Sequence, residues 1–155
     1  MTTPAEPADA IADRLAIIDL VNGYVDMLDG KQWDLFDSFF TDDAVAWMNP
    51  QRRLEGRAAI HAFTSGMLGD DEIVTYHHVA SFTPVIQGDT ARADVRIRAM
   101  HRGVGSREGR FWESLAVQES AFVRTPDGWR CNAFTWRVVV GLGSLDLFDG
   151  LWPRT

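Results

Sequence analysis

Three ionisable side chains, Asp29, His78 and His101, have the types and the spacing that proton-transfer chemistry requires. Imidazole is the side chain whose ordinary pKa lies nearest to neutral pH, so a histidine can accept a proton from carbon. A carboxylate beside it fixes the imidazole tautomer and stabilises the imidazolium that forms. This chemistry requires the three side chains to share one interior.

Alternation along two predicted strands places the histidines, because successive side chains of a strand face opposite sides of the sheet. Along residues 90–101 the odd positions are apolar and include His101, whereas the even positions are mostly charged. Along residues 73–86 the more apolar set of positions contains His78 and not His77. We therefore expect His78 and His101 to face the interior.

The carboxylate comes from a predicted helix. From about Asp9, apolar residues recur every three or four positions, which indicates an amphipathic helix packed on a core. At ~100° per residue, Asp29 returns to within about 20° of the apolar stripe. The helix is expected to end at Asp29-Gly30, with Gly30 in the left-handed C-terminal position.

Further elements follow from the change of periodicity along the chain. Two short helices are expected at about residues 32–40 and 57–68, and the period then changes to two. The expected strands cover residues 44–48, 73–86, 90–101, 110–124 and 128–140. Helices followed by hairpin-linked strands indicate an α+β fold, with three N-terminal helices packed on a curved antiparallel sheet. Such a cone-shaped barrel encloses a pocket.

Composition sets the remaining limits. The chain has 155 residues, of which 46% are hydrophobic and 24% charged, as in a single globular domain. A net charge of −7 argues against nucleic acid as a partner. The one cysteine, Cys131, cannot form an internal disulfide and is expected to be a small buried hydrophobe. We find no targeting or membrane-spanning pattern, so we expect a cytoplasmic protein with no membrane partner.

We divide the chain into a flexible N-terminal tail, residues 1–8, and one domain, residues 9–155. Within that domain, residues 141–155 form an apolar C-terminal segment. An exposed apolar segment is an aggregation hazard, so it should cover something. It is expected to serve as a lid over the pocket or as a subunit contact.

Several stretches together resemble the SnoaL-like branch of the nuclear transport factor 2-like superfamily, over about residues 10–140. The stretches are Leu28-Asp29-Gly30-Lys31-Gln32-Trp33-Asp34, Phe40-Thr41-Asp42-Asp43-Ala44-Val45, Glu55-Gly56-Arg57-Ala58-Ala59-Ile60, Tyr76-His77-His78, Gly88-Asp89-Thr90-Ala91, Met100-His101-Arg102 and Asp127-Gly128-Trp129-Arg130. Within the superfamily, the catalytic pattern is most similar to that of scytalone dehydratases and hexachlorocyclohexane dehydrochlorinases. Their aspartate and first histidine fall on Asp29 and His78, and the second histidine of the dehydratases falls on His101.

The resemblance also shows departures. The tyrosines that hold the substrate carbonyl in scytalone dehydratases fall on about Leu28 and Met48, and a strand-borne asparagine falls on about Glu119. These departures argue against the same substrate. Glu119 is expected to face inward, as a second acid/base group or as a substrate contact.

The resemblance implies a cofactor-independent lyase or isomerase without a metal. In it, His78, held by Asp29, removes a proton from carbon in a small apolar, cyclic substrate, and His101 protonates or hydrogen-bonds the leaving oxygen or an enolate. The residues expected to contact the substrate are Tyr24, Trp47, Met48, Phe63, Tyr76, Glu119 and Trp136. Two alternatives stay open, a SnoaL-type polyketide cyclase and a non-catalytic small-molecule binder or accessory subunit. Self-association as a homo-oligomer, dimer or trimer, is also implied.

Overall fold

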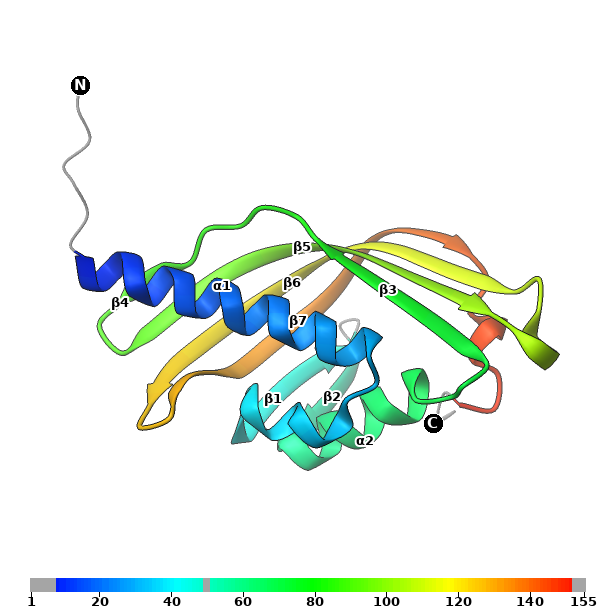
Figure 1. The fold of residues 1–155 in the computed structure, drawn as a ribbon, viewed down its shortest axis with the longest axis horizontal. Coiled ribbons are helices and arrows are strands. Elements are labelled where there is room, and N and C mark those ends of the chain that lie inside the picture. Colours follow the sequence, from blue (N-terminus) through cyan, green and yellow to red (C-terminus); the bar gives the residue numbers. More distant parts are fainter. Residues whose placement is uncertain (1–7, 49–50, 152–155) are drawn as a thin grey trace, which may run out of the picture.

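The computed structural model describes residues 8–48 and 51–151 (Figure 1). The predicted N-terminal tail lies outside the described residues except for residue 8, which begins the first helix. Residues 152–155 of the predicted C-terminal segment also lie outside them. In the described part of the chain, no helix has the length and apolar character needed to cross a membrane.

Three helical segments precede most of the sheet, as predicted. They are α1 (Ala8–Asp29), the 3-10 helix η1 (Trp33–Ser38) and α2 (Arg57–Leu68). α1 lies across the sheet, and η1 and α2 lie beside the C-terminal end of α1 (Figure 1). Their buried faces pack against the inner face of the sheet and form one aromatic-rich core, which includes Tyr24, Phe36, Phe40, Ile60 and Phe134. Cys131 is buried in this core, as predicted.

The end of α1 differs in detail from the prediction. The Gln32 N–H donates to the Met27 carbonyl (3.0 Å) and the Lys31 N–H to the Leu28 carbonyl (3.2 Å), the pattern of a Schellman turn. The left-handed residue is therefore Lys31, with φ 51°, and the prediction of Gly30 is wrong. The Lys31 ammonium also donates to the Asp70 carbonyl, which ties the end of α1 to the turn that precedes the third strand.

The sheet is mixed and strongly curved (Figure 1). Its strands are β1 (Phe40–Met48), β2 (Arg52–Glu55), β3 (Ile73–Val79), β4 (Val85–Gln87), β5 (Thr90–Gly103), β6 (Phe111–Thr125) and β7 (Gly128–Gly143). The strand order is β2-β1-β7-β6-β5-β3, and β4 pairs with β5. β1 runs parallel to β7, so the predicted antiparallel sheet needs correction at this one pairing.

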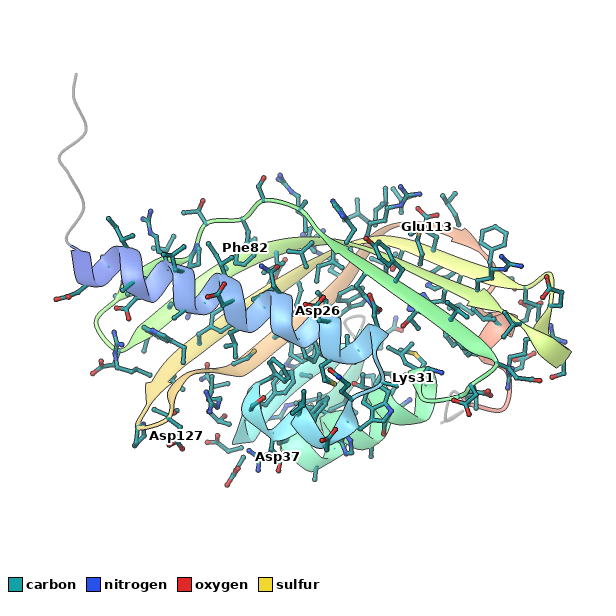
Figure 2. The ribbon with its side chains drawn as sticks, viewed as in Figure 1. Asp26, Lys31, Asp37, Phe82, Glu113 and Asp127 are labelled. Carbon is teal, nitrogen blue, oxygen red and sulfur yellow. The ribbon has the colours of Figure 1, made fainter. Side chains whose placement is uncertain are left out.

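One predicted strand is interrupted, and one short strand was not predicted. The strand expected at residues 73–86 stops at Val79, and the chain returns to the sheet only at Val85. Pro84 lies just before Val85 and has no N–H for a strand ladder, which limits pairing at this point. β2 was not predicted, because four residues are too few to show a period. Many charged side chains lie on the surface of the molecule. Asp26, Asp37 and Asp127, for example, are exposed (Figure 2).

Candidate active site

A cavity of about 130 Å³ lies between the helices and the inner face of the sheet. Most of its wall is apolar, and the polar side chains that reach it come from five different elements. These are Tyr24 of α1, Thr64 of α2, His77 of β3, His101 of β5, and Ser114 and Gln118 of β6. The remaining lining residues are Val25, Leu28, Met48, Met67, Leu68, Ile97, Ala99, Trp112, Phe134, Trp136, Val138, Leu145 and Phe148. A few polar groups in a mostly apolar cavity are typical of a small-molecule site.

Asp29 and His77 form the best-defined pair in this wall. The Asp29 Oδ1 atom lies 2.6 Å from His77 Nδ1, and Asp29 Oδ2 accepts the backbone N–H of His77 at 2.7 Å. The Thr75 hydroxyl donates to Oδ1 at 3.0 Å. Because a carboxylate only accepts hydrogen bonds, Nδ1 of His77 carries the hydrogen. In the neutral ring, Nε2 on the other side then has the lone pair that can take a proton.

The carboxylate remains ionised in this position. Burial alone raises the pKa of Asp29, but the hydrogen bonds from the His77 ring and backbone and from Thr75 outweigh burial, and the pKa lies below its ordinary value. The side chain of His77 is only 6% exposed and that of Asp29 21% exposed. An ionised carboxylate on a nearly buried imidazole stabilises the imidazolium form once a proton has been taken.

The prediction that His78 shares this interior is wrong. His78 is exposed on the outer face of β3, where it lines a shallow hollow with Leu115 and Val139. The apolar count failed because the outer face is itself apolar, with Val74 and Tyr76 more than half exposed. The inward face also carries Thr75 and His77, whose side chains bind Asp29.

His101 lies in the cavity wall, as alternation along β5 predicts. Its Nδ1 lies 3.1 Å from the Trp112 carbonyl, and because a carbonyl only accepts hydrogen bonds, Nδ1 is the donor. In the neutral ring, Nε2 is therefore unprotonated. Its ring meets that of His77 edge to face, with centroids 5.5 Å apart. Burial, with a smaller effect of the neighbouring His77, lowers the pKa of His101 to about 4. His101 is therefore a neutral hydrogen-bond acceptor near neutral pH and not a proton donor.

This burial predicts a pH dependence of stability. The pKa of His101 is near its ordinary value of 6.5 in the unfolded chain, whereas it is about 4 in the native state. Stability should therefore fall as the pH falls through this window, by about 2 to 3 kcal/mol on reaching pH ~4.5. Urea unfolding of the wild type and of His101→Gln at pH ~7 and ~4.5 measures it. The variant should lose clearly less stability than the wild type, and equal losses would refute the assignment.

Three of the predicted substrate contacts line the cavity, namely Tyr24, Met48 and Trp136. Their contact with a substrate stays a prediction. Tyr24 packs among the rings of Phe36, Phe39 and Phe40, with centroid distances of 5.2–6.3 Å, and burial raises its pKa, so its phenol stays protonated. It can therefore donate a hydrogen bond at the cavity wall.

The other four predicted contacts lie elsewhere. Trp47 and Tyr76 are exposed on the outer sides of β1 and β3. Phe63 is buried, but its ring packs under the Arg52 guanidinium (4.8 Å) and does not line the cavity. Glu119 is half-exposed on the outer face of β6, where it pairs with Arg137 at 3.2 Å. The predicted inward position of Glu119 is therefore wrong.

The sequence reasoning missed Gln118 and Ser114, which occupy the inner face of β6 where Glu119 was expected. Both are buried, and the Gln118 amide donates to the Ser120 hydroxyl at 3.1 Å. A register shift in the β6–β7 ladder between Leu115 and Ala116 lies near this face. One signal was available, because a polar series at every second position of a long strand requires either solvent or a functional interior.

Comparison with known proteins extends this geometry. A family model described as "SnoaL-like domain" matches residues 9–135. An uncharacterized protein of Mycobacterium tuberculosis (strain ATCC 25618 / H37Rv) is 32% identical over 121 residues, which cover 77% of this chain and 81% of that protein.

Within the described residues, no group of three or more His, Cys, Asp and Glu side chains is placed to hold a metal ion.

Two solved structures share the fold with lower identity. A candidate scytalone dehydratase of Novosphingobium aromaticivorans DSM 12444 superposes with a TM-score of 0.80 at 18% identity, over 89% of this chain and 92% of that chain. A hexachlorocyclohexane dehydrochlorinase of Novosphingobium barchaimii LL02 gives a TM-score of 0.73 at 16% identity, over 88% and 93%. The fold is thus that of nuclear transport factor 2-like proteins, and the matched domain shows that the chain belongs to the SnoaL-like family.

Proposed function

We propose that this protein is a cofactor-independent lyase or isomerase in which His77 removes a proton from carbon of a small, mostly apolar, cyclic substrate. The observation that carries the proposal is the 2.6 Å contact between Asp29 Oδ1 and His77 Nδ1 at the wall of an apolar cavity. This contact leaves Nε2 as the base. The dehydratase and the dehydrochlorinase that share the fold support the reaction class.

A single base, His77, can both remove the proton and return it. His77 Nε2 takes the proton as the C–H bond breaks, and the electron pair of that bond forms the new double bond. In an elimination of water the C–O bond then breaks, and the imidazolium returns its proton to the departing hydroxide. In a double-bond shift the same proton returns to another carbon. Asp29 stays ionised and stabilises the imidazolium throughout.

Of the two roles predicted for His101, we propose hydrogen bonding and not proton donation. Because it is neutral and donates its Nδ1 hydrogen to Trp112, its Nε2 lone pair can only accept a hydrogen bond. We propose that it accepts from a hydroxyl of the substrate and thereby orients the ring. Donors for a carbonyl or an enolate oxygen come instead from the Tyr24 phenol and the Gln118 amide, both of which line the cavity.

The size of the cavity supports a substrate of about one ring. A cavity of about 130 Å³ is close to the ~150 Å³ apolar cavity that accommodates benzene in an engineered protein. The larger, elongated pocket that a SnoaL-type polyketide cyclase needs would require this cavity to expand. Apolar walls also exclude water from the two imidazoles, which strengthens the ion pair that forms when His77 takes a proton.

The experiment uses a panel of single-ring ketones and β-hydroxyketones. Binding is measured by thermal shift, and proton abstraction is measured in D₂O by the loss of the α-proton NMR signal. Wild-type protein is expected to exchange or dehydrate at least one ketone that it binds. Binding of several probes with no exchange of any would support the non-catalytic binder instead.

A further inference from the structure

Residues 144–151, here called the cap segment, close one end of the cavity. Leu145 and Phe148 of this segment line the cavity, and the Phe148 ring meets the His101 ring edge to face at 5.3 Å. Leu147 and Phe148 are almost completely buried. The segment's own helix, η3 (Leu145–Phe148), is a single 3-10 turn, which is too short to be stable alone. Its position must therefore be set by contacts with the rest of the chain.

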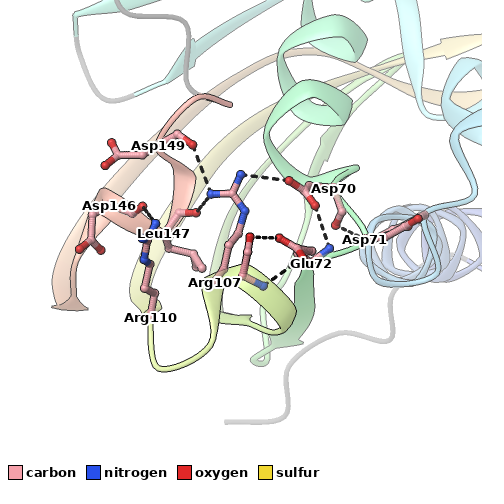
Figure 3. Close-up of polar contacts among 10 residues, drawn as sticks. Asp70, Asp71, Glu72, Arg107, Arg110, Asp146, Leu147 and Asp149 are labelled. Atoms are coloured by element: carbon pink, nitrogen blue, oxygen red, sulfur yellow. Dashed lines mark hydrogen bonds and ion pairs between the residues drawn. The ribbon is translucent and has the colours of Figure 1, made fainter.

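Arg107 supplies such contacts from the turn between β5 and β6 (Figure 3). Its Nη1 donates to the Leu147 carbonyl (2.8 Å) and to the Asp149 carbonyl (3.2 Å), and its Nη2 pairs with Asp70 Oδ2 at 3.1 Å. The side chain is only 14% exposed. One planar guanidinium thus joins the cap segment, the β5–β6 turn and the turn between α2 and β3. This use of several fixed donors is specific to arginine.

The two turns that hold Arg107 are themselves fixed. Asp70 Oδ1 accepts the Glu72 N–H at 2.8 Å, and this hydrogen bond, with the Arg107 guanidinium, holds the pKa of Asp70 below its ordinary value. The Glu72 carboxylate in turn accepts from the Ser106 N–H (3.0 Å) and from the Ser106 hydroxyl. Asp70 and Glu72 lie in the turn between α2 and β3, so Arg107 reaches the cap segment from two turns that are hydrogen-bonded to each other (Figure 3).

From this geometry we propose that Arg107 is a positioning residue that keeps the cap segment closed and, through Phe148, holds the His101 ring in the cavity wall. The catalytic consequence rests on the proposed function of the cavity, whereas the closure itself does not. Without the guanidinium, the Leu147 and Asp149 carbonyls lose their charged donor. The cap segment should then open more often and release ligand faster.

Hydrogen exchange followed by mass spectrometry tests the closure directly. In Arg107→Ala, amides of residues 145–151 are expected to exchange at least ~10-fold faster, while amides of β5 and β6 keep their protection. Arg110→Ala is the matched control, since Arg110 donates to the Asp146 carbonyl of the same segment at 3.3 Å but is exposed. Its effect should stay within about two-fold. Unchanged protection of the cap segment in Arg107→Ala would overturn the proposal.

Arg107→Lys keeps the test informative if the alanine variant does not fold. A lysine keeps a charge beside Asp70, but a single ammonium cannot bridge all three acceptors at the observed distances. Exchange of the cap segment should be faster by at least about three-fold, and protection equal to that of the wild type would contradict the bridging role.

Kinetics separate this proposal from the proposed function. With a ring ketone that the wild type exchanges in D₂O, Arg107→Ala should raise KM about ten-fold or more and change kcat by less than about three-fold, because the base itself is untouched. An equal loss in kcat with unchanged KM would overturn the positioning role. If the wild type exchanges no ketone, the proposed function fails, while hydrogen exchange still decides whether Arg107 closes the cap segment.

Discussion

Replacing His77 with glutamine is expected to lower kcat for proton abstraction by about 10²- to 10⁴-fold, the usual contribution of a positioned general base. Glutamine can still pair with Asp29 through its amide, so the variant should fold. It has no basic nitrogen, however, and among the described residues that line the cavity no other imidazole is paired with a carboxylate. NMR of α-proton loss from a bound ring ketone in D₂O gives the rate for the wild type and the variant.

His78→Gln is the matched control for this substitution. His78 is the adjacent residue on the same strand, but it lies on the outer face of the sheet. Its replacement should leave the exchange rate within about two-fold of the wild-type value, as for surface substitutions in general. If His78→Gln abolished exchange and His77→Gln did not, the assignment of the base would be reversed.

Asp29→Asn is expected to cause a second large loss, of the order of 10²- to 10⁴-fold in kcat, by changing the tautomer of His77. The asparagine oxygen can still accept the His77 backbone N–H, which directs its amide NH₂ towards His77 Nδ1. Nδ1 must then act as an acceptor, the ring hydrogen moves to Nε2, and the base in the cavity is lost. The same substitution also removes the negative charge that stabilises the imidazolium.

Two measurements distinguish this effect from unfolding. ¹H–¹⁵N correlation spectra of the histidine rings should show the hydrogen on Nδ1 of His77 in the wild type and on Nε2 in Asp29→Asn. Asp26→Asn, an exposed position one turn earlier on α1 (Figure 2), should change neither the tautomer nor the rate. Full activity of Asp29→Asn would show that the carboxylate has no part in the reaction.

The sequence predicted the helices, the order of most strands and two of the three ionisable groups, because these depend on local periodicity. The stripe of α1 and the alternation of β5 each have one clearly apolar face, so they bring Asp29 and His101 to the interior. β3 does not have such a face. Its outer side is as apolar as its inner side, and a one-residue choice between His77 and His78 could not be made from hydrophobicity.

Other errors have a tertiary origin. Glu119 was misplaced because the buried inner face of β6 carries Ser114 and Gln118, whereas its outer face is the more apolar one, and only the packing of the sheet decides which face is inner. The parallel pairing of β1 with β7 joins segments about ninety positions apart, as in the Phe40–Cys131 pair, and no short-range pattern reveals it. The role of Arg107 was likewise hidden, since its acceptors come from two distant parts of the chain.

The most direct test of the Asp29–His77 pair as a carbon base is the transfer of solvent deuterium to a ring ketone bound in the cavity. The wild type and His78→Gln are expected to incorporate deuterium at the α-carbon at similar rates, whereas His77→Gln and Asp29→Asn should do so at least ~100-fold more slowly. Deuterium incorporation by His77→Gln at the wild-type rate would contradict the proposed function.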